Sequence, residues 1–254
     1  MTSPAGARAA ALTITVVIPA KDEEQRIGHA LDRLVAASPG LGITEIIVVD
    51  DGSKDRTGAI VREAAQHPAP DVRLLRHEVN RGKSASLRTG MLAATGDLVA
   101  LFDADLSVAP EHLSDALALI GAGADLVIGR RGEREGQSLV RRLGSRLFGV
   151  LQRSIVRLPF VDTQCPFKVV RREALGAVLP HLFVERWNFD VEFLVVAIRQ
   201  GLDVRELPVE WKHVDGSTIR LTPGYFVEQP RALWQIRRAH GSGRPPKGRR
   251  ADAR

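Results

Sequence analysis

Short apolar runs recur along this chain, and between them apolar residues are spaced as on one face of a helix. Such runs, often rich in β-branched residues, are typical of buried strands. They lie at residues 13–18, 45–49, 72–76, 98–102, 125–128 and 204–209, and a further strand-like segment begins near Lys168. Helical spacing follows at 22–34, 55–66 and 83–94, after 110, before 179, at 187–199 and after 223. Asp22 is the expected N-cap of the first of these helices. This alternation predicts an α/β fold, with a mainly parallel sheet flanked by helices on both faces.

Acidic residues follow the ends of several predicted strands. Right-handed crossovers bring the carboxyl ends of parallel strands to one edge, so we expect Pro19, Asp51, Asp103 and Asp105 to be neighbours. Asp103 and Asp105 follow the apolar run 98–102 directly, and paired carboxylates suit a hard divalent cation such as Mg²⁺ or Mn²⁺. The alternative is a solvated loop, or acids that favour the start of the helix after Pro110.

The loops exclude two common functions of α/β proteins. A dinucleotide-binding turn reads Gly-x-Gly-x-x-Gly, but residues 19–24 read Pro-Ala-Lys-Asp-Glu-Glu and contain no glycine. Residues 82–84 match the end of a phosphate-binding Gly-x-x-x-x-Gly-Lys-Ser loop, but its leading glycine position holds His77. Neither a nicotinamide dehydrogenase nor a P-loop nucleotidase is therefore indicated.

Length and cysteine content bound the architecture. The 254 residues, 44% of them hydrophobic, suffice for one α/β domain with a proper core. The single cysteine, Cys165, excludes an internal disulfide and fits a reducing compartment. No apolar run approaches the roughly 18–20 residues that span a bilayer, and the N-terminal residues lack a signal-peptide core. We therefore expect a cytoplasmic protein without an integral membrane anchor.

The positive charge is concentrated at the C-terminal end. The net charge is +6, yet residues 231–254 hold eight Lys/Arg against one acid, while the preceding residues hold 28 basic and 29 acidic side chains. A localised basic surface suggests a polyanion or an anionic membrane as partner. Residues 241–254 are rich in Gly, Pro and Arg, and this composition predicts a disordered basic tail.

Residues 137–158 predict a basic amphipathic helical insert. Apolar residues recur there at spacings of three and four, and arginines recur on the opposing side at Arg142, Arg146, Arg153 and Arg157. Such a helix can lie in a lipid interface. An ordinary surface helix packed on the domain is the alternative.

Five motifs follow one another in a set order along the chain. They are Val16-Val17-Ile18-Pro19-Ala20-x-Asp22-Glu23, Val48-Val49-Asp50-Asp51-Gly52-Ser53, Asn80-x-Gly82-Lys83, Asp103-Ala104-Asp105 and Asp162-Thr163-Gln164-Cys165. In order and spacing they resemble the family-two inverting glycosyltransferases, over about residues 13–238. Residues 162–165 and 186–192 favour the dolichyl-phosphate β-glucosyltransferase subgroup over the mannosyl one. The resemblance implies a GT-A type nucleotide-binding fold in one catalytic domain, residues 12–240. Its nucleotide-sugar half would be 12–130, and its acceptor half 131–240 would include the insert.

The resemblance also implies roles on the donor side. Asp105, with Asp103 beside it, would hold Mg²⁺ or Mn²⁺ against the leaving diphosphate. Lys83 would lie near the nucleotide, although Ser84 replaces the glycine that usually follows it, and a solvated loop lysine is the alternative. One member of the Asp50–Asp51 pair is expected to serve only a turn and a helix cap. The base and ribose would be held by Pro19, Ala20, Glu23 and Asp51.

On the acceptor side the chemistry favours an anionic acceptor. A sugar hydroxyl needs a general base, whereas a polyprenyl phosphate needs mainly positioning and charge compensation. The sequence offers cations but no convincing base, and its histidines, His77 among them, fall in no triad or ligand spacing and are interpreted as structural. Arg131 aligns with a family arginine near the phosphates, and Arg220 would replace the usual lysine. The expected phosphate contacts are Arg131, Lys168, Ser217 and Arg220. Asp162 would orient Arg131, and the expected catalytic residues are Asp105, Arg131 and Asp162. Further acceptor-side candidates are Gln164, Asp190 and Glu192.

The sequence therefore predicts transfer of glucose from UDP-glucose to a polyprenyl phosphate of the dolichyl type. The enzyme would lie peripherally at the inner face of the membrane, on an anionic surface. A GDP-mannose-dependent enzyme of the same fold is the nearest alternative. A non-catalytic protein that binds polyanions or membrane surfaces is the alternative from another class. Nucleic acid is not an expected partner, because no recognition helix, RNA-binding aromatic motif or zinc spacing occurs.

Overall fold

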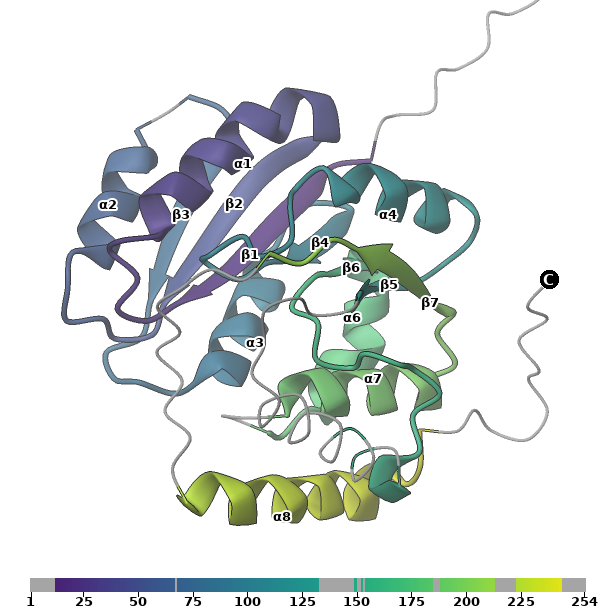
Figure 1. Ribbon diagram of the computed structural model, residues 1–254. Helices are drawn as coiled ribbons and strands as arrows, with labels where there is room; N and C mark the ends of the chain where they lie inside the picture. Colours follow the sequence, from purple (N-terminus) through teal and green to yellow (C-terminus); the bar gives the residue numbers. More distant parts are fainter. Residues whose placement is uncertain are drawn as a thin grey trace, which may run out of the picture.

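The computed structural model describes residues 12–66, 68–132, 149, 152, 154–184, 188–212 and 223–243. Its centre is a seven-stranded sheet in the order β3-β2-β1-β4-β6-β5-β7 (Figure 1). The strands are β1 Ile14–Ala20, β2 Ile43–Asp50, β3 Asp71–Arg76, β4 Leu98–Leu101, β5 Leu126–Arg131, β6 Lys168–Arg171 and β7 Val204–Val209. Every strand predicted from the apolar runs is present.

The sheet is mixed but mainly parallel, as predicted. Strands β1 to β4 pair in parallel with their neighbours among themselves, and β5 pairs in parallel with β7. Only β6 runs the other way, antiparallel to both β4 and β5. The register sets Ala20 at the end of β1 beside Asp50 at the end of β2. The loops that follow these strands therefore start from one edge.

Helices cover both faces of the sheet (Figure 1). One face packs on α1 Ile27–Leu41, α2 Thr57–Ala64 and α4 His112–Gly121, and the other packs on α3 Lys83–Ala93, α6 Arg172–Val178 and α7 Phe189–Arg199. Helix α8 Pro223–His240 packs on α7, beyond this layer (Figure 1). Alternate residues of β1 divide between the two cores: Val16 and Ile18 face the first, and Val17 faces the second. This period of two is what buries the strand from both sides.

The first helix begins later than the sequence pattern predicts. Asp22 was expected to cap it, but α1 begins at Ile27, and Arg26 precedes it without a side-chain cap. Asp22 instead adopts a left-handed conformation with φ 53°, and its carboxylate accepts a hydrogen bond from the backbone N–H of Lys54 at 2.8 Å. The prediction of the cap is wrong because a contact with the next loop uses this carboxylate, and residues 21–26 form a long loop before the helix.

The predicted insert lies largely outside the described residues, and so do Arg142, Arg146 and Arg153. Within it, Gly149, Gln152 and residues 154–156 are helical. The end of the insert packs on the domain, since Val156 is fully buried and Leu158 is nearly so. Residues 244–254 of the predicted tail also lie outside the described part. None of the described helices has the length and apolar character needed to cross a bilayer.

Candidate active site

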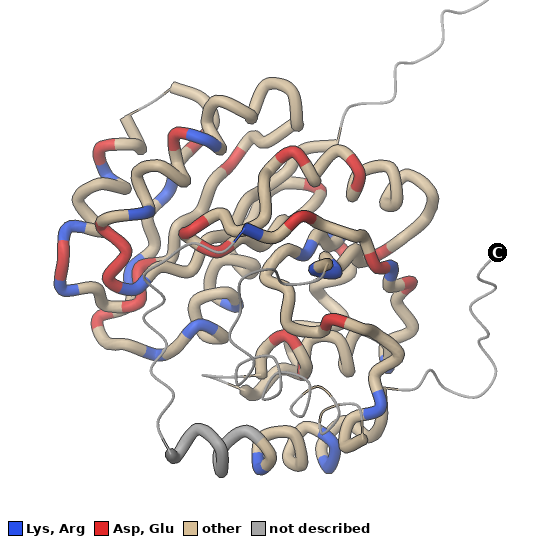
Figure 2. The backbone as a smooth tube through the Cα atoms, in the orientation of Figure 1, with Lys and Arg blue, Asp and Glu red and all other residues tan. Residues whose placement is uncertain are grey.

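The strand ends converge as predicted. The backbone N–H of Asp51 donates to the carbonyl of Ala20 at 2.9 Å, and that of Phe102 donates to the carbonyl of Val17 at 3.1 Å. The loops after β1, β2 and β4 therefore leave the same edge of the sheet, and Figure 2 shows acidic positions gathered in them. Pro19 and Ala20, the last residues of β1, lie opposite Val49 and Asp50 in this register.

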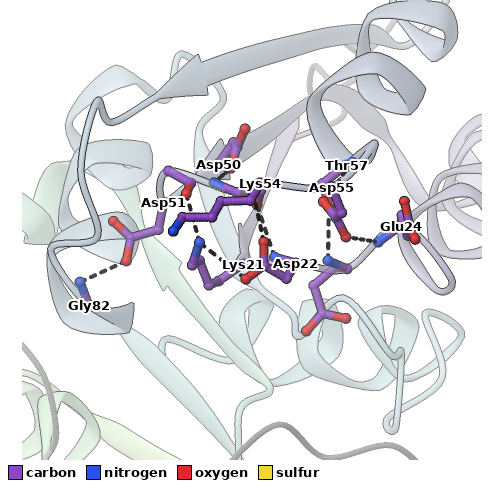
Figure 3. A network of polar contacts seen from close by, with 12 residues as sticks. Lys21, Asp22, Glu24, Asp50, Asp51, Lys54, Asp55, Thr57 and Gly82 are labelled. Carbon is purple, nitrogen blue, oxygen red and sulfur yellow. Dashed lines mark hydrogen bonds and ion pairs between the residues drawn. The ribbon is translucent and has the colours of Figure 1, made fainter.

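Hydrogen bonds connect the loops after β1 and β2 directly (Figure 3). The backbone N–H of Asp22 donates to the Ser53 hydroxyl at 2.9 Å. The Lys21 ammonium donates to the carbonyl of Gly52 at 2.7 Å, and the backbone N–H of Glu24 donates to the Asp55 carboxylate at 3.0 Å. Because side chains of each loop satisfy backbone groups of the other, the two loops form one preorganised surface.

Glu23 faces the two carboxylates that follow β4. Burial raises the pKa of Glu23 above its usual value, and the negative charges of Asp105 and Asp103 add to this rise. The guanidinium of Arg26 opposes the shift through a hydrogen bond of 2.6 Å to the Glu23 carboxylate. The structure thus brings Glu23, a predicted nucleotide-side residue, close to the predicted metal pair.

Asp103 and Asp105, the predicted cation ligands, have few other protein partners among the described residues. One oxygen of Asp105 accepts the backbone N–H of Ser107 at 2.9 Å, and Asp103 is paired with the Lys83 ammonium. Among the described residues no group of three or more His, Cys, Asp or Glu side chains could hold a metal. Two carboxylates fit a Mg²⁺ or Mn²⁺ ion that keeps waters and binds substrate phosphates, rather than a cage of protein ligands.

Lys83 stands in a strongly negative environment. Partial desolvation of the ammonium acts to lower the pKa of Lys83, but the surrounding negative charges outweigh it and raise that pKa above its usual value. These charges belong, in order of strength, to Asp103, Asp190 and Asp105. The structure therefore places Asp190, from the second half of the chain, close to the donor-side cluster.

Asp51 is buried, with 3% of its surface exposed, and is held by three donors. Its carboxylate accepts the backbone N–H groups of Arg81 at 2.8 Å and Gly82 at 2.7 Å. A ring nitrogen of His77 lies 2.8 Å away. Burial acts to raise the pKa of Asp51, but these hydrogen bonds together lower it below its usual value. The neighbouring Asp50 accepts the backbone N–H of Ser53 at 2.8 Å, which is the turn role expected for one member of the pair.

Sequence reasoning missed the contact that His77 makes. Its Nδ1 lies 2.8 Å from the Asp51 carboxylate and its Nε2 lies 3.0 Å from the Thr89 hydroxyl of α3. The ring is 8% exposed. No local motif could have revealed this, because Asp51 is 26 positions earlier in the chain.

Arg131 and Asp162 form a bidentate ion pair. Arg131 Nε lies 2.6 Å and Nη2 lies 2.8 Å from the two carboxylate oxygens. Burial acts to raise the pKa of Asp162, but the Arg131 contacts lower it below its usual value. The contact expected between these two predicted catalytic residues is present, and its planar geometry fixes the guanidinium. Gln164 is exposed next to the pair, and its backbone N–H donates to Asp162 at 3.2 Å.

Lys168 is almost fully buried, with 1% of its surface exposed. Its ammonium donates to the carbonyl of Cys165 at 2.6 Å and pairs with the Asp190 carboxylate. In this arrangement Lys168 fixes the position of Asp190, whose side chain is 21% exposed.

Glu192 does not belong to this group, which corrects the expectation of an acceptor-side role. Its fully buried carboxylate accepts the backbone N–H groups of Phe183 and Val184. His240 at the end of α8 lies 3.0 Å away. Glu192 thus connects α7, the preceding loop and α8. The other two predicted acceptor contacts, Ser217 and Arg220, lie outside the described residues.

Backbone strain borders the site. Left-handed conformations are uncommon outside glycine, and they cluster at functional sites. Asp22, Leu106 and Asn188 adopt them, with φ of 53°, 45° and 68°, and each lies within two residues of a predicted site residue. Arg157, with φ 58°, also adopts one. Asn188 is 7% exposed, and neither polar atom of its amide has a hydrogen-bond partner within the described part of the chain. No sequence pattern indicated this environment.

Comparison with known proteins identifies the family. The model of "Glycosyl transferase family 2" matches residues 15–179. Dolichyl-phosphate beta-glucosyltransferase ALG5C of Trichomonas vaginalis is 37% identical over 226 residues, which cover 82% of this chain and 66% of that protein. The human dolichyl-phosphate beta-glucosyltransferase is 30% identical, over 81% of this chain and 69% of its own length. This chain thus spans about two thirds of the length of these relatives.

Solved structures share the fold. Glucosyl-3-phosphoglycerate synthase from Mycobacterium tuberculosis, in complex with UDP, superposes with a TM-score of 0.68 at 23% identity, covering 94% of this chain and 83% of that one. The same enzyme with Mn²⁺, UDP-glucose and phosphoglyceric acid gives a TM-score of 0.67. The fold prediction is confirmed, and so is the resemblance on which it depended. The chain belongs to glycosyl transferase family 2.

Proposed function

We propose that this chain transfers glucose from UDP-glucose to a polyprenyl phosphate of the dolichyl type, with inversion at the sugar carbon. The observation that supports it most is the convergence on one sheet edge of Asp51, Glu23, Asp103 and Asp105, with the Arg131–Asp162 and Lys168–Asp190 pairs contributed by the second half of the chain. The names of the relatives support the donor and acceptor classes.

Asp51 is proposed to recognise the uracil base. One of its oxygens already accepts from Arg81 and His77, whereas the other accepts only from Gly82 among the described residues. A carboxylate oxygen can accept two hydrogen bonds, so the second oxygen can also accept the imide N–H of uracil. Pro19, Ala20 and Glu23 would line the same side of the base and ribose.

Asp103 and Asp105 are proposed to hold Mg²⁺ or Mn²⁺. A bound ion of this kind neutralises the charge of the departing diphosphate, the Lewis-acid role of a metal. The protein's own task is to orient these carboxylates, and the Ser107 backbone N–H does this for Asp105.

The acceptor phosphate is proposed to be its own nucleophile. One of its oxygens would form the bond to the anomeric carbon of glucose, while the bond from that carbon to the diphosphate oxygen breaks. No proton needs to be removed, so the proposal requires cations rather than a base. Arg131, fixed by Asp162, is the strongest described candidate for the phosphate contact, with Ser217 and Arg220 as further candidates and Lys168 acting through Asp190.

A peripheral position at the cytoplasmic face of a membrane is proposed, and helix α8 supports the membrane contact. Its buried side is formed by Leu233 and Ile236. The opposite side exposes Trp234, 64% accessible, between the exposed Arg231 and Arg238. A tryptophan flanked by arginines is typical of helices that lie in an anionic lipid interface. The arginines of the predicted insert 137–158 would add positive charge for the same kind of partner.

A donor panel tests the proposal. The full chain is incubated with Mn²⁺ or Mg²⁺, polyprenyl phosphate in vesicles, and UDP-glucose, GDP-mannose or other nucleotide sugars, and the labelled lipid product is measured. We expect product from UDP-glucose. Product from GDP-mannose alone would contradict the donor assignment. Vesicle binding without transfer from any donor would favour the non-catalytic membrane-binding alternative.

A further inference from the structure

We propose that the Lys83 ammonium competes with the divalent cation for the Asp103 carboxylate, and that it moves to the donor diphosphate when cation and donor bind together. Lys83 would thereby make metal binding depend on the donor. This inference rests on the proposed function, since it concerns the same Asp103–Asp105 pair.

The backbone before Lys83 is fixed from the nucleotide side. Gly82, with φ 96°, precedes α3 and donates its backbone N–H to Asp51 at 2.7 Å. Lys83 is the first residue of α3, and its side chain reaches Asp103, near the start of the loop after β4. One short segment thus contacts the proposed base-binding residue through its backbone and the proposed metal ligand through its side chain.

The position is unfavourable for a lysine on local grounds. A cation at the N-terminal end of a helix is opposed by the helix dipole. No acidic residue in the first turn of α3 compensates for it. The compensation comes from Asp103, which is 20 positions away in the sequence. A residue that depends on such a distant partner is suited to respond when that partner changes.

The charge balance of the site singles out this pair. Glu23 is paired with Arg26, Asp162 with Arg131, and Asp190 with Lys168. In contrast, Asp103 and Asp105 share one cation among the described residues, Lys83. Two adjacent carboxylates with a single ammonium keep an excess negative charge that favours a divalent cation.

Lys83 can leave Asp103 without unfolding its surroundings. Its side chain is 40% exposed and that of Asp103 is 32% exposed, whereas Lys168 in the neighbouring pair is 1% exposed. An exposed pair of this kind contributes little to stability, so exchange of its partner costs little. A diphosphate bound at the Asp103–Asp105 site would offer the ammonium a new anionic partner.

The competition predicts effects of opposite sign for metal and donor. In Lys83→Met, Asp103 loses its competitor, and Mn²⁺ alone is expected to bind about fivefold or more tightly than to the native protein. The same change removes the ammonium from the diphosphate, so UDP at saturating Mn²⁺ is expected to bind about tenfold more weakly. If Lys83 only filled space or only attracted UDP, its replacement by Met would not strengthen Mn²⁺ binding.

The test uses the full chain and two titrations by calorimetry: Mn²⁺ without nucleotide, and UDP at saturating Mn²⁺. Lys83→Arg keeps the charge and is expected to stay within about twofold of the native Mn²⁺ affinity. Lys54→Met is the matched control: it removes a neighbouring, exposed lysine whose backbone, not its side chain, contacts Asp22. In the Asp103→Asn background, the further change Lys83→Met should no longer strengthen Mn²⁺ binding.

The outcomes separate the two proposals. Equal or weaker Mn²⁺ binding by Lys83→Met, with UDP still bound by the native chain, would overturn the role of Lys83 alone. An equal gain in Lys54→Met would also overturn it, because a general charge effect would then suffice. If neither Mn²⁺ nor UDP bound to any variant, both this inference and the proposed function would be wrong.

Discussion

The two halves of the candidate site hold their acidic side chains in different ways. On the first half, backbone N–H groups hold Asp51, from Arg81 and Gly82, and Asp105, from Ser107. Glu23 and Asp103 of this half are paired with side chains, those of Arg26 and Lys83. On the second half, the described acids of the site are paired with cationic side chains, Asp162 with Arg131 and Asp190 with Lys168.

This difference indicates a division of tasks. Acids that are held by backbone N–H groups remain charged and able to accept more ligands, which suits a base N–H or a metal ion. When an acid is paired with a buried cation, its negative charge is neutralised by that cation, and its effect is to orient the cation. We therefore propose that the first half binds the donor and that the second positions charge around the acceptor.

The largest expected effect is the loss of a charge from the first half. Asp105→Asn should reduce transfer by at least about 100-fold, because a preorganised charge at the leaving group is removed. Asp32→Asn, an exposed acid on α1, is the matched control and should retain full activity. Initial rates of lipid-product formation measure both, with circular dichroism to verify folding. Full activity of Asp105→Asn in the presence of a chelator would exclude the metal role.

Breaking a pair in the second half should affect stability as well as activity. Asp162→Asn leaves the Arg131 guanidinium, 12% exposed, without its charged partner, which should cost about 3 kcal/mol of folding free energy. Denaturant unfolding measures this. Arg131→Lys keeps the charge but loses the bidentate geometry, so we expect a raised KM for the polyprenyl phosphate with little change in KM for UDP-glucose.

The same pair predicts an acid dependence. The pKa of Asp162 is lower in the folded chain than its usual value. Its stabilising contribution should therefore be complete above about pH 4, the usual value for an aspartate, and should be lost as the pH falls through the folded pKa. The stability difference between native chain and Asp162→Asn should shrink in that range. A constant difference from neutral pH to pH 2 would contradict this.

His77 tests whether the first half depends on side chains as well as on the backbone. Removing the hydrogen bond to the charged Asp51 by His77→Ala should weaken UDP binding about tenfold. The kcat should change little, since His77 acts through Asp51. His77→Asn, whose amide can replace the Nδ1 donor, should recover part of the affinity. A loss in kcat alone would point to a different role.

The smallest expected effect lies outside both halves, on α8. Changing Arg231 to Gln should weaken binding to anionic vesicles by about fivefold, since a basic residue near such a surface contributes about 1 kcal/mol. Added salt should reduce the difference. Trp234→Ala should weaken binding to anionic and neutral vesicles alike. Sedimentation with vesicles measures both. Unchanged binding would remove α8 from the membrane surface.

The sequence by itself determined the sheet and the place of the donor-side acids. Alternation in β1 sends Val16 and Val17 to opposite cores, and the apolar run before Asp103 ends at the same edge as β1 and β2. These features are local, because strand period and chain handedness fix them. The five motifs were sufficient for the family, and the match over residues 15–179 bears this out.

Only the tertiary structure decided which partner each charged side chain has. His77 meets Asp51 across 26 positions, Arg131 meets Asp162 across 31, and Glu192 meets His240 across 48. Such contacts have no period in the sequence, because they depend on how helices and loops pack against one another. For the same reason Asp22 proved to be a loop contact rather than a helix cap, and Glu192 a structural residue. The sequence specifies which side chains are present, but their chemical role depends on burial and on neighbours that are distant in the chain.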